Sequence, residues 1–115
     1  MTITRQNVGP RMSGAVVHDG TVYLAGQVST EPSASTKGQT AEVLKKIDAL
    51  LAAAGTSKSK LLSATIYLSN IANFDEMNSV WDAWVEPGNT PARATVEARL
   101  ANPKCLVEIS VVAAV

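Results

Sequence analysis

TPARATVEARL (residues 90–100) and KCLVEISVVAAV (residues 104–115) are the two stretches that decide the fold of this chain. Both are rich in β-branched and apolar residues, as is typical of strands that become buried in a sheet. Each stretch nevertheless carries a charge, Arg93 in the first and Glu108 in the second. Burying either charge without a partner would be costly, so we expect each to face an opposite charge or a ligand.

Side chains alternate along a strand, so Arg93 and Thr95 share one face of their strand, and Glu108 and Ser110 share one face of theirs. We expect the charged residues to lie together on one sheet surface. Two interpretations stay open at this point. The pair is either a structural ion pair at an interface or a site in which Arg93 binds a substrate carboxylate and Glu108 orients water.

The rest of the sequence predicts strands and helices in the order β-β-α-β-α-β-β along the chain. Asp19-Gly20 is a hairpin signal, and Thr36 with Gln39 is a capping box at the start of a helix that Gly55 ends. The expected fold is α+β, with both helices on one face of the sheet. The predicted strands are residues 13–17, 21–27, 61–68, 92–99 and 105–114, and the predicted helices are residues 36–54 and 74–86.

The length of 115 residues fits one domain, residues 1–115, and 46% hydrophobic residues can fill a core. The run LVEISVVAAV is apolar on both sides of its strand, so the sheet face opposite the helices also needs a cover. With no residues left over in the chain, another copy of the protein is the simplest cover. We therefore expect a homo-oligomer.

The composition argues against several classes of partner. Ten basic and ten acidic residues balance, which makes a nucleic-acid surface or an anionic membrane surface unlikely. One cysteine and one histidine are too few for a usual zinc site, and no G-x-G-x-x-G or Walker pattern is present, so we expect neither metal nor cofactor. The N-terminus lacks the layout of a signal peptide, which favours a cytoplasmic location.

Three residue types that could carry chemistry have simpler interpretations. His18 flanks a hairpin turn, where an exposed and chemically idle imidazole is expected. Cys105 has no basic partner nearby in the sequence and is expected to be a small apolar filler. Trp81 and Trp84 lie on the apolar stripe of a predicted helix, which favours core packing over a base-stacking platform.

Taken in order, several motifs resemble the Rid family of reactive-intermediate imine/enamine deaminases, also called the YjgF or liver perchloric-acid-soluble protein family. The resemblance covers nearly the whole chain, and MNSVWDAWV, NPKCLVEISVVAAV and RMSGAVVHDG are similar to the YoaB-like branch. The motifs that carry it are HDGTVYLAGQV, GQT before LLAAAG, SATIYLSNIANFDEMNSVWDAW, TPARATVEARL and VEISVVAAV.

The resemblance implies a chorismate-mutase-like fold and a homotrimer with three sites in the clefts between subunits. It implies hydrolysis of small 2-imino and 2-enamino acids to 2-keto acids and ammonia, in which Arg93 holds the carboxylate and Glu108 hydrogen-bonds the attacking water. Thr95, Gly26 and Ala25 are expected to bind the substrate together with Arg93. The chain departs from the family pattern at Thr95, where many members have cysteine, and at Ala25, where serine is frequent. An N-terminal tyrosine of the family has no clear counterpart here.

Three functions follow as hypotheses. The first is a cofactor-free deaminase of the 2-iminobutanoate/2-iminopropanoate type. The second is a trimer that binds small carboxylates or keto acids without turnover, as a sensor or chaperone-like partner. The third is an endoribonuclease, a label attached to some family members, which the balanced charge makes the least favoured.

Overall fold

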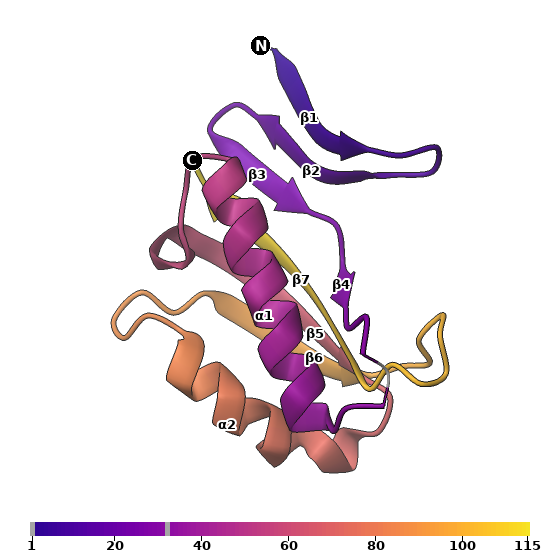
Figure 1. Ribbon diagram of the computed structural model, residues 1–115. Helices are drawn as coiled ribbons and strands as arrows, with labels where there is room; N and C mark the ends of the chain where they lie inside the picture. Colours follow the sequence, from indigo (N-terminus) through magenta and orange to yellow (C-terminus); the bar gives the residue numbers. More distant parts are fainter. Residues whose placement is uncertain (1, 32) are drawn as a thin grey trace.

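The computed structural model describes residues 2–31 and 33–115 as one sheet with helices packed on one side (Figure 1). Its elements follow the chain from the N-terminal strands to a C-terminal strand at the middle of the sheet. They are β1 (Ile3–Val8), β2 (Ser13–His18), β3 (Thr21–Leu24), β4 (Gln27–Val28), α1 (Thr36–Ala53), the 3₁₀ turn Lys58–Lys60, β5 (Leu61–Leu68), the 3₁₀ turn Ile71–Asn73, α2 (Phe74–Trp84), β6 (Ala92–Glu97) and β7 (Val107–Ala114).

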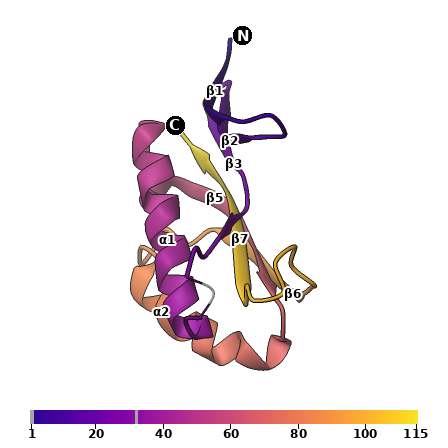
Figure 2. The ribbon, with the colours of Figure 1, turned by 45° about the vertical axis from the view of Figure 1, so that its right-hand side comes forward.

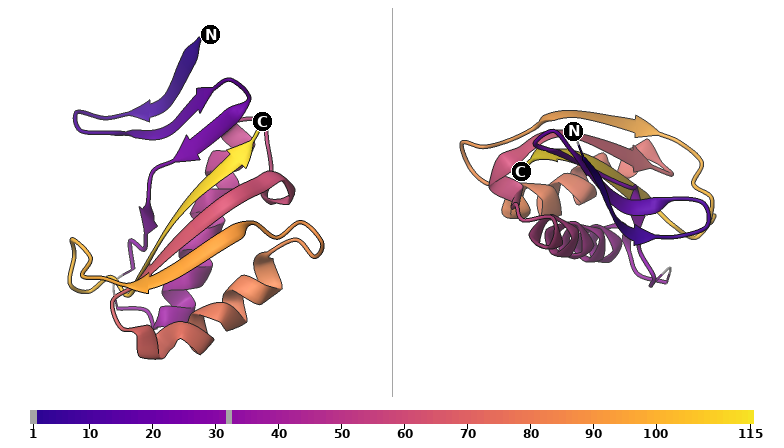
Figure 3. Two further views of the ribbon diagram at one scale, coloured as in Figure 1. Left: turned by 180° about the vertical axis from the view of Figure 1, so that it is seen from behind. Right: turned by 90° about the horizontal axis from the view of Figure 1, so that it is seen from above.

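The strands lie in the order β1-β2-β3-β7-β5-β6, and the short β4 also pairs with β7. All pairs are antiparallel except β5 with β6, which are parallel and joined through α2. The view from behind shows this sheet with the helices beyond it (Figure 3). The two most apolar strands, β5 and β7, are therefore neighbours at the middle of the sheet, where burial is greatest.

Both helices cover the same face of the sheet, and within residues 2–31 and 33–115 no helix lies over the other face (Figure 2). The core lies between α1, α2 and this face. It takes alternate residues of each strand and one stripe of each helix, as the periods of strand and helix require. Its largest fully buried members include Leu44, Ile47, Leu51, Ile66, Leu68, Met77 and Ile109.

The predicted fold class is confirmed, and the structure adds two strands to the predicted order. β1 was missed because its sequence, ITRQNV, is mostly polar, and the single strand predicted at residues 21–27 is divided into β3 and the two-residue β4. The hairpin turn lies where Asp19-Gly20 predicts it, with φ of 52° and 78° at the two residues. Gly55, with φ of 82°, follows the end of α1 as predicted.

The predicted capping box of α1 is wrong by one residue. Ser35 is the N-cap, and its hydroxyl accepts a hydrogen bond from the Gly38 amide at 3.1 Å. The Gln39 side chain instead reaches across to the final strand, where its Oε1 accepts from the Leu106 amide at 2.8 Å. The position of a glutamine in the sequence does not show whether its side chain caps the helix or, as here, binds a segment far along the chain.

Among the helices of residues 2–31 and 33–115, none combines the length and the apolar character needed to cross a bilayer. The longest, α1, has 18 residues, but it carries several charges along its outer side.

Candidate active site

Arg93 and Thr95 lie on the helix-covered face of the sheet. In the register of β6 with β5, Arg93 pairs with Ala64 and Thr95 pairs with Ile66. Both partners are core residues beneath the helices. Because directly paired residues project to the same face, Arg93 and Thr95 point toward the side of α2.

Glu108 lies on the opposite face. It pairs with Tyr67 of β5, whose neighbours in the strand, Ile66 and Leu68, are the buried core residues. The expectation that Arg93 and Glu108 lie together on one sheet surface is therefore wrong within a single chain. Alternation fixes which residues of one strand share a face, but it does not relate the faces of two strands until their register is known.

Helix α2 holds the Arg93 side chain in place. Its guanidinium carbon lies 5.2 Å from the centre of the Trp81 ring and 5.9 Å from that of Phe74. Arg93 Nη1 donates a hydrogen bond to Asn78 Oδ1 at 2.8 Å. Phe74, Asn78 and Trp81 are spaced by four and three residues, so they lie on one side of α2. The aromatic rings and the amide fix the direction of the guanidinium, while its other N–H groups make no hydrogen bond within the described residues.

Thr95 contributes a buried hydroxyl without a partner. Its Oγ1 is inaccessible to solvent and makes no hydrogen bond within the described part of the chain. A buried polar group usually has a partner, since leaving it unpaired costs about 1–3 kcal/mol. Thr95 follows Arg93 by two residues on the same face of β6, so its hydroxyl lies on the helix-covered side of the strand with Arg93.

On the other face, Glu108 lines a cleft of about 340 Å³. Tyr67 and Ser110 line it from the neighbouring strand positions, Gly26 from the β3–β4 connection, and Arg99 from the segment after β6. This volume falls in the range of small-molecule sites. The cleft brings together a carboxylate, a guanidinium and a phenol, which are groups that can bind and protonate a small polar ligand.

Gly26 lies directly against Glu108. A Cβ atom added at Gly26 would overlap a carboxylate oxygen of Glu108, so the carboxylate can keep this position only beside a glycine. Ala25, the preceding residue, has a structural role. Its amide donates to Gly14 O at 2.9 Å, and its carbonyl accepts from Gln27 Nε2 at 2.9 Å. Of the two residues predicted here from the resemblance, Gly26 lines the Glu108 cleft and Ala25 does not line it.

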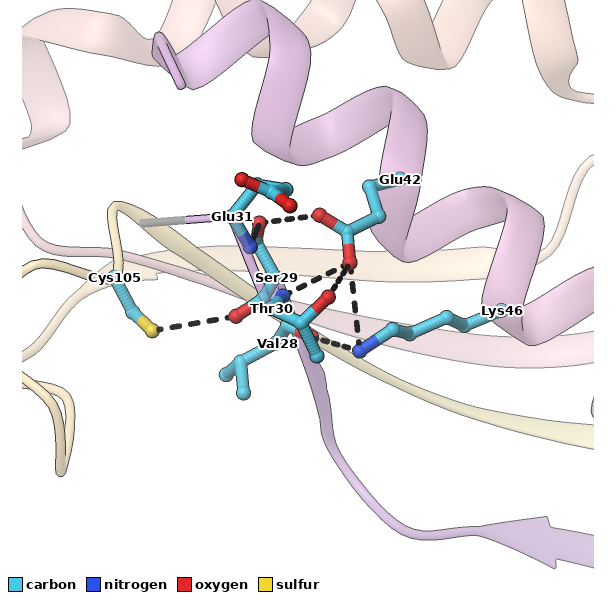
Figure 4. Close-up of polar contacts among 7 residues, drawn as sticks. All are labelled: Val28, Ser29, Thr30, Glu31, Glu42, Lys46 and Cys105. Atoms are coloured by element: carbon cyan, nitrogen blue, oxygen red, sulfur yellow. Dashed lines mark hydrogen bonds and ion pairs between the residues drawn. The ribbon is translucent and has the colours of Figure 1, made fainter. Parts of the chain in front are cut away.

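A latch of polar contacts holds the segment after β4 against α1 (Figure 4). The Glu42 carboxylate accepts hydrogen bonds from Ser29 Oγ at 2.5 Å, from the Thr30 amide at 2.8 Å and from Thr30 Oγ1 at 2.7 Å. Lys46 Nζ lies 3.6 Å from the carboxylate and donates to Val28 O at 2.8 Å. We call these five residues, Val28, Ser29, Thr30, Glu42 and Lys46, the Glu42 latch.

The Glu42 latch lowers the pKa of the Glu42 carboxyl from 4.5 to about 2. The hydrogen bond from Ser29 is the largest cause, followed by those from Thr30, all of which favour the charged form. Val28 pairs with Glu108 in the sheet, so the latch also fixes the strand that lies beside Glu108.

The simpler interpretations of the other candidates agree with their surroundings. Cys105 is 2% exposed, with its Sγ 4.0 Å from Ser29 O, as expected of a buried filler. Trp81 belongs to the core, and Trp84 packs against it with its indole nitrogen bonded to Asp48. His18 is partly exposed at the end of β2. Within the described residues, no group of three or more His, Cys, Asp or Glu side chains is placed to hold a metal ion.

Sequence reasoning missed Asn78, Arg99 and Tyr67. The spacing of Asn78 relative to Phe74 and Trp81 places it on their side of α2, but only the tertiary structure shows that this side meets Arg93. Tyr67 could be assigned to a strand face, yet its position opposite Glu108 depends on register. Arg99 was expected to lie within a strand of residues 92–99, but β6 ends at Glu97, and Arg99 belongs to the segment that follows.

Comparison with known proteins identifies the family of the chain. The model of the family described as Endoribonuclease L-PSP matches residues 4–115. The RutC family protein YoaB of Escherichia coli is 47% identical over 115 residues, which is the full length of both chains. A RutC family protein of Haemophilus ducreyi is 50% identical over 113 residues, covering 98% of this chain and 97% of the relative.

Solved structures agree in fold. A member of the YjgF protein family from Neisseria meningitidis superposes with a TM-score of 0.97 at 46% identity, covering 99% of this chain and 95% of the other. A Rid-family protein from Yersinia pestis gives a TM-score of 0.83 at 36% identity, covering 94% and 90%. The chain therefore belongs to the endoribonuclease L-PSP family, which is the YjgF or Rid family, and it resembles the YoaB proteins along its whole length.

Proposed function

We propose that the protein is a cofactor-free deaminase that hydrolyses small 2-imino and 2-enamino acids, of the 2-iminobutanoate and 2-iminopropanoate type, to 2-keto acids and ammonia in the cytoplasm. The observation that carries the proposal is the pair Arg93 and Glu108. Each side chain is fixed by its strand, and each keeps groups that could meet a ligand. The family resemblance assigns carboxylate binding to the first and water positioning to the second.

The chemistry needs little machinery, because the carbon of an imine is already electrophilic. Water adds to the C=N carbon, the nitrogen gains a proton, and the resulting carbinolamine expels ammonia to leave the 2-keto acid. Glu108 accepts a hydrogen bond from the attacking water and can return a proton to the departing nitrogen. Arg93 holds the substrate carboxylate through two parallel N–H groups, and the Thr95 hydroxyl offers a further hydrogen bond beside it.

The site as proposed requires more than one copy of the chain. Arg93 and Glu108 open on opposite faces of a single sheet, so one substrate can meet both only where two copies pack together. The uncovered face carries exposed apolar side chains, including Tyr23 at 49% and Val96 at 43% exposure. Such a face favours association. The proposed assembly is the homotrimer implied by the family, with its sites between subunits.

The experiment measures 2-keto-acid release from an imine made in place by an amino-acid oxidase. Purified wild type, Arg93→Ala and the charge-matched surface variant Lys37→Gln are added in turn. Lys37 is exposed at the start of α1, and it neither lines the Glu108 cleft nor contacts the Arg93 side chain. Acceleration by wild type and Lys37→Gln, with loss in Arg93→Ala, is the expected result. Release that stays at the uncatalysed rate with every protein would overturn the deaminase proposal.

The non-catalytic alternative predicts a different outcome from the same proteins. A trimer that only captures small acids would bind a 2-keto acid in an Arg93-dependent manner and leave the rate of imine hydrolysis unchanged. Calorimetric titration with 2-oxobutanoate measures this binding directly. Salt-dependent RNA cleavage abolished by Arg93→Ala would instead favour the endoribonuclease hypothesis.

A further inference from the structure

We propose that Arg99 is a second anion-binding residue of this site, and that the cleft containing Glu108 therefore favours 2-imino acids that carry a second carboxylate. This inference rests on the deaminase function proposed above and specifies its substrate class. It begins from the fact that Arg93 lies on the other face of the sheet. Within one chain, the guanidinium that shares a cleft with Glu108 is that of Arg99.

The backbone fixes the place of Arg99 at the rim of this cleft. β6 ends at Glu97, and the next residue, Ala98, donates its amide to Leu68 O at 2.9 Å. This bond anchors the chain one residue before Arg99. Arg99 then lines both the Glu108 cleft of about 340 Å³ and an adjoining cleft of about 550 Å³. Arg99 is exposed and belongs to the lining of both clefts.

The N–H groups of the Arg99 guanidinium have no partner in the described part of the chain. Within residues 2–31 and 33–115, this guanidinium makes no hydrogen bond or ion pair, and the Tyr67 hydroxyl and Glu108 carboxylate likewise make none. Ser110, by contrast, already donates to Leu24 O at 3.3 Å. Arg93 is also partly engaged, through Asn78 and the aromatic rings of α2. Arg99, Tyr67 and Glu108 line one cleft and leave a cation, a phenol and a carboxylate open to solvent, so all three groups can bind a ligand there.

The charges of the cleft select the ligand. Among its lining residues, Arg99 is the single cation and Glu108 the single anion. If Arg93 of another copy takes the 2-carboxylate, as proposed above, the Arg99 guanidinium remains for a second anionic group on the same substrate. A carboxylate matches a guanidinium in charge and planar geometry. The substrate class is thus a 2-imino dicarboxylic acid, whose hydrolysis gives a 2-keto dicarboxylic acid and ammonia.

The test compares two imines with one set of proteins. 2-Iminosuccinate is generated by L-aspartate oxidase, and 2-iminobutanoate by an L-amino-acid oxidase. We expect wild type to show a higher kcat/KM for the dicarboxylate, and Arg99→Gln to lose about tenfold to a hundredfold for that substrate, the range of one charge-assisted contact. For 2-iminobutanoate the loss should stay below about threefold, because that substrate has no second carboxylate. Lys37→Gln, with the same change in charge, should match wild type.

A conservative variant and a binding measurement separate recognition from folding. Arg99→Lys keeps the charge and should recover part of the dicarboxylate preference. Calorimetric titration with oxaloacetate, the keto-acid product, should show weaker binding to Arg99→Gln than to wild type. An equal loss for both imines would overturn the inference, as would wild type that prefers 2-iminobutanoate. Either result leaves deamination itself standing, whereas inactivity toward both imines would defeat the proposed function instead.

Discussion

Arg93 and Glu108 project from opposite faces of one sheet, on strands that are both paired with β5. Ala64 of β5 lies beside Arg93 on the helix side, and Tyr67 lies beside Glu108 on the uncovered side. An ion pair between these two residues within one chain is therefore excluded by geometry. If they act on one substrate, the site lies between copies of the protein, so activity and assembly should be lost together.

Assembly can be tested on the uncovered face. Tyr23 is 49% exposed at the centre of β3, and it projects to the same side as Glu108 through its pairing with Val112. Tyr23→Glu would place a charge in the proposed interface, which is strongly unfavourable when desolvated. We expect light scattering to give a trimer mass for wild type and a monomer mass for Tyr23→Glu. A monomeric wild type that still accelerates imine hydrolysis would contradict the shared site.

Glu108 is expected to affect turnover more than binding. Glu108→Gln keeps the shape of the side chain but removes the charge that orients water and carries a proton. General acid–base groups contribute about 100-fold to 10,000-fold, so kcat should fall by at least about 100-fold while KM changes less than about threefold. Steady-state kinetics on 2-iminobutanoate measures both constants. A rise in KM at constant kcat would show instead that Glu108 only binds the substrate.

Gly26 should act through Glu108. In Gly26→Ala, the new Cβ would force the carboxylate aside, and the three atoms nearest to that Cβ all belong to the Glu108 side chain. Because a carboxylate at the end of a side chain can rotate away, we expect a loss of stability below about 1 kcal/mol together with a clear fall in kcat. In the Glu108→Gln background, Gly26→Ala should reduce kcat no further. Independent, additive losses in this double-mutant cycle would argue against the coupling.

Asn78 should direct the Arg93 guanidinium. Asn78→Ala removes the 2.8 Å hydrogen bond but leaves the rings of Phe74 and Trp81 in place. We expect kcat/KM to fall by roughly fivefold to tenfold, the range of a single hydrogen bond, and Arg93→Ala to cost more. The two substitutions together should be no worse than Arg93→Ala alone. Asn78→Ala that is as damaging as Arg93→Ala would assign Asn78 a direct contact with substrate.

The Glu42 latch predicts how stability depends on pH. The pKa of Glu42 falls from 4.5 to about 2 on folding, so the unfolded chain takes up the proton more readily as the solution is acidified. The stabilisation is therefore complete above about pH 4.5 and disappears as the pH falls toward 2. Chemical unfolding from pH 7 to pH 2 should show Glu42→Gln less stable than wild type at pH 7, with the difference shrinking across this window.

The matched control for this measurement is Glu31→Gln. Glu31 belongs to the same segment and is exposed, and within the described residues its carboxylate makes no hydrogen bond or ion pair. Its unfolding profile should follow that of wild type at every pH. A difference between wild type and Glu42→Gln that stays constant from pH 7 to pH 2 would show that the lost contacts are not linked to protonation of this carboxyl.

The sequence by itself determined the long elements, because their signals are local. The apolar period of α1, the β-branched run of β5 and the Asp19-Gly20 turn each depend on residues close in the chain, and each element lies where its pattern predicts it. Arg93 and Glu108 could be selected in the same way, as charges within apolar strands. β1 and β4 could not be predicted, since one is polar and the other is too short to show a period.

Only the tertiary structure decided which residues share a site. The register of β5 with its two neighbours separates Arg93 from Glu108, and the packing of α2 gives Arg93 its amide and aromatic contacts. The same register joins Tyr67 to Glu108, and the turn after β6 brings Arg99 into their cleft. Strand periodicity relates residues two apart on one strand, whereas a site is made of residues on different strands, whose relative faces follow from long-range pairing.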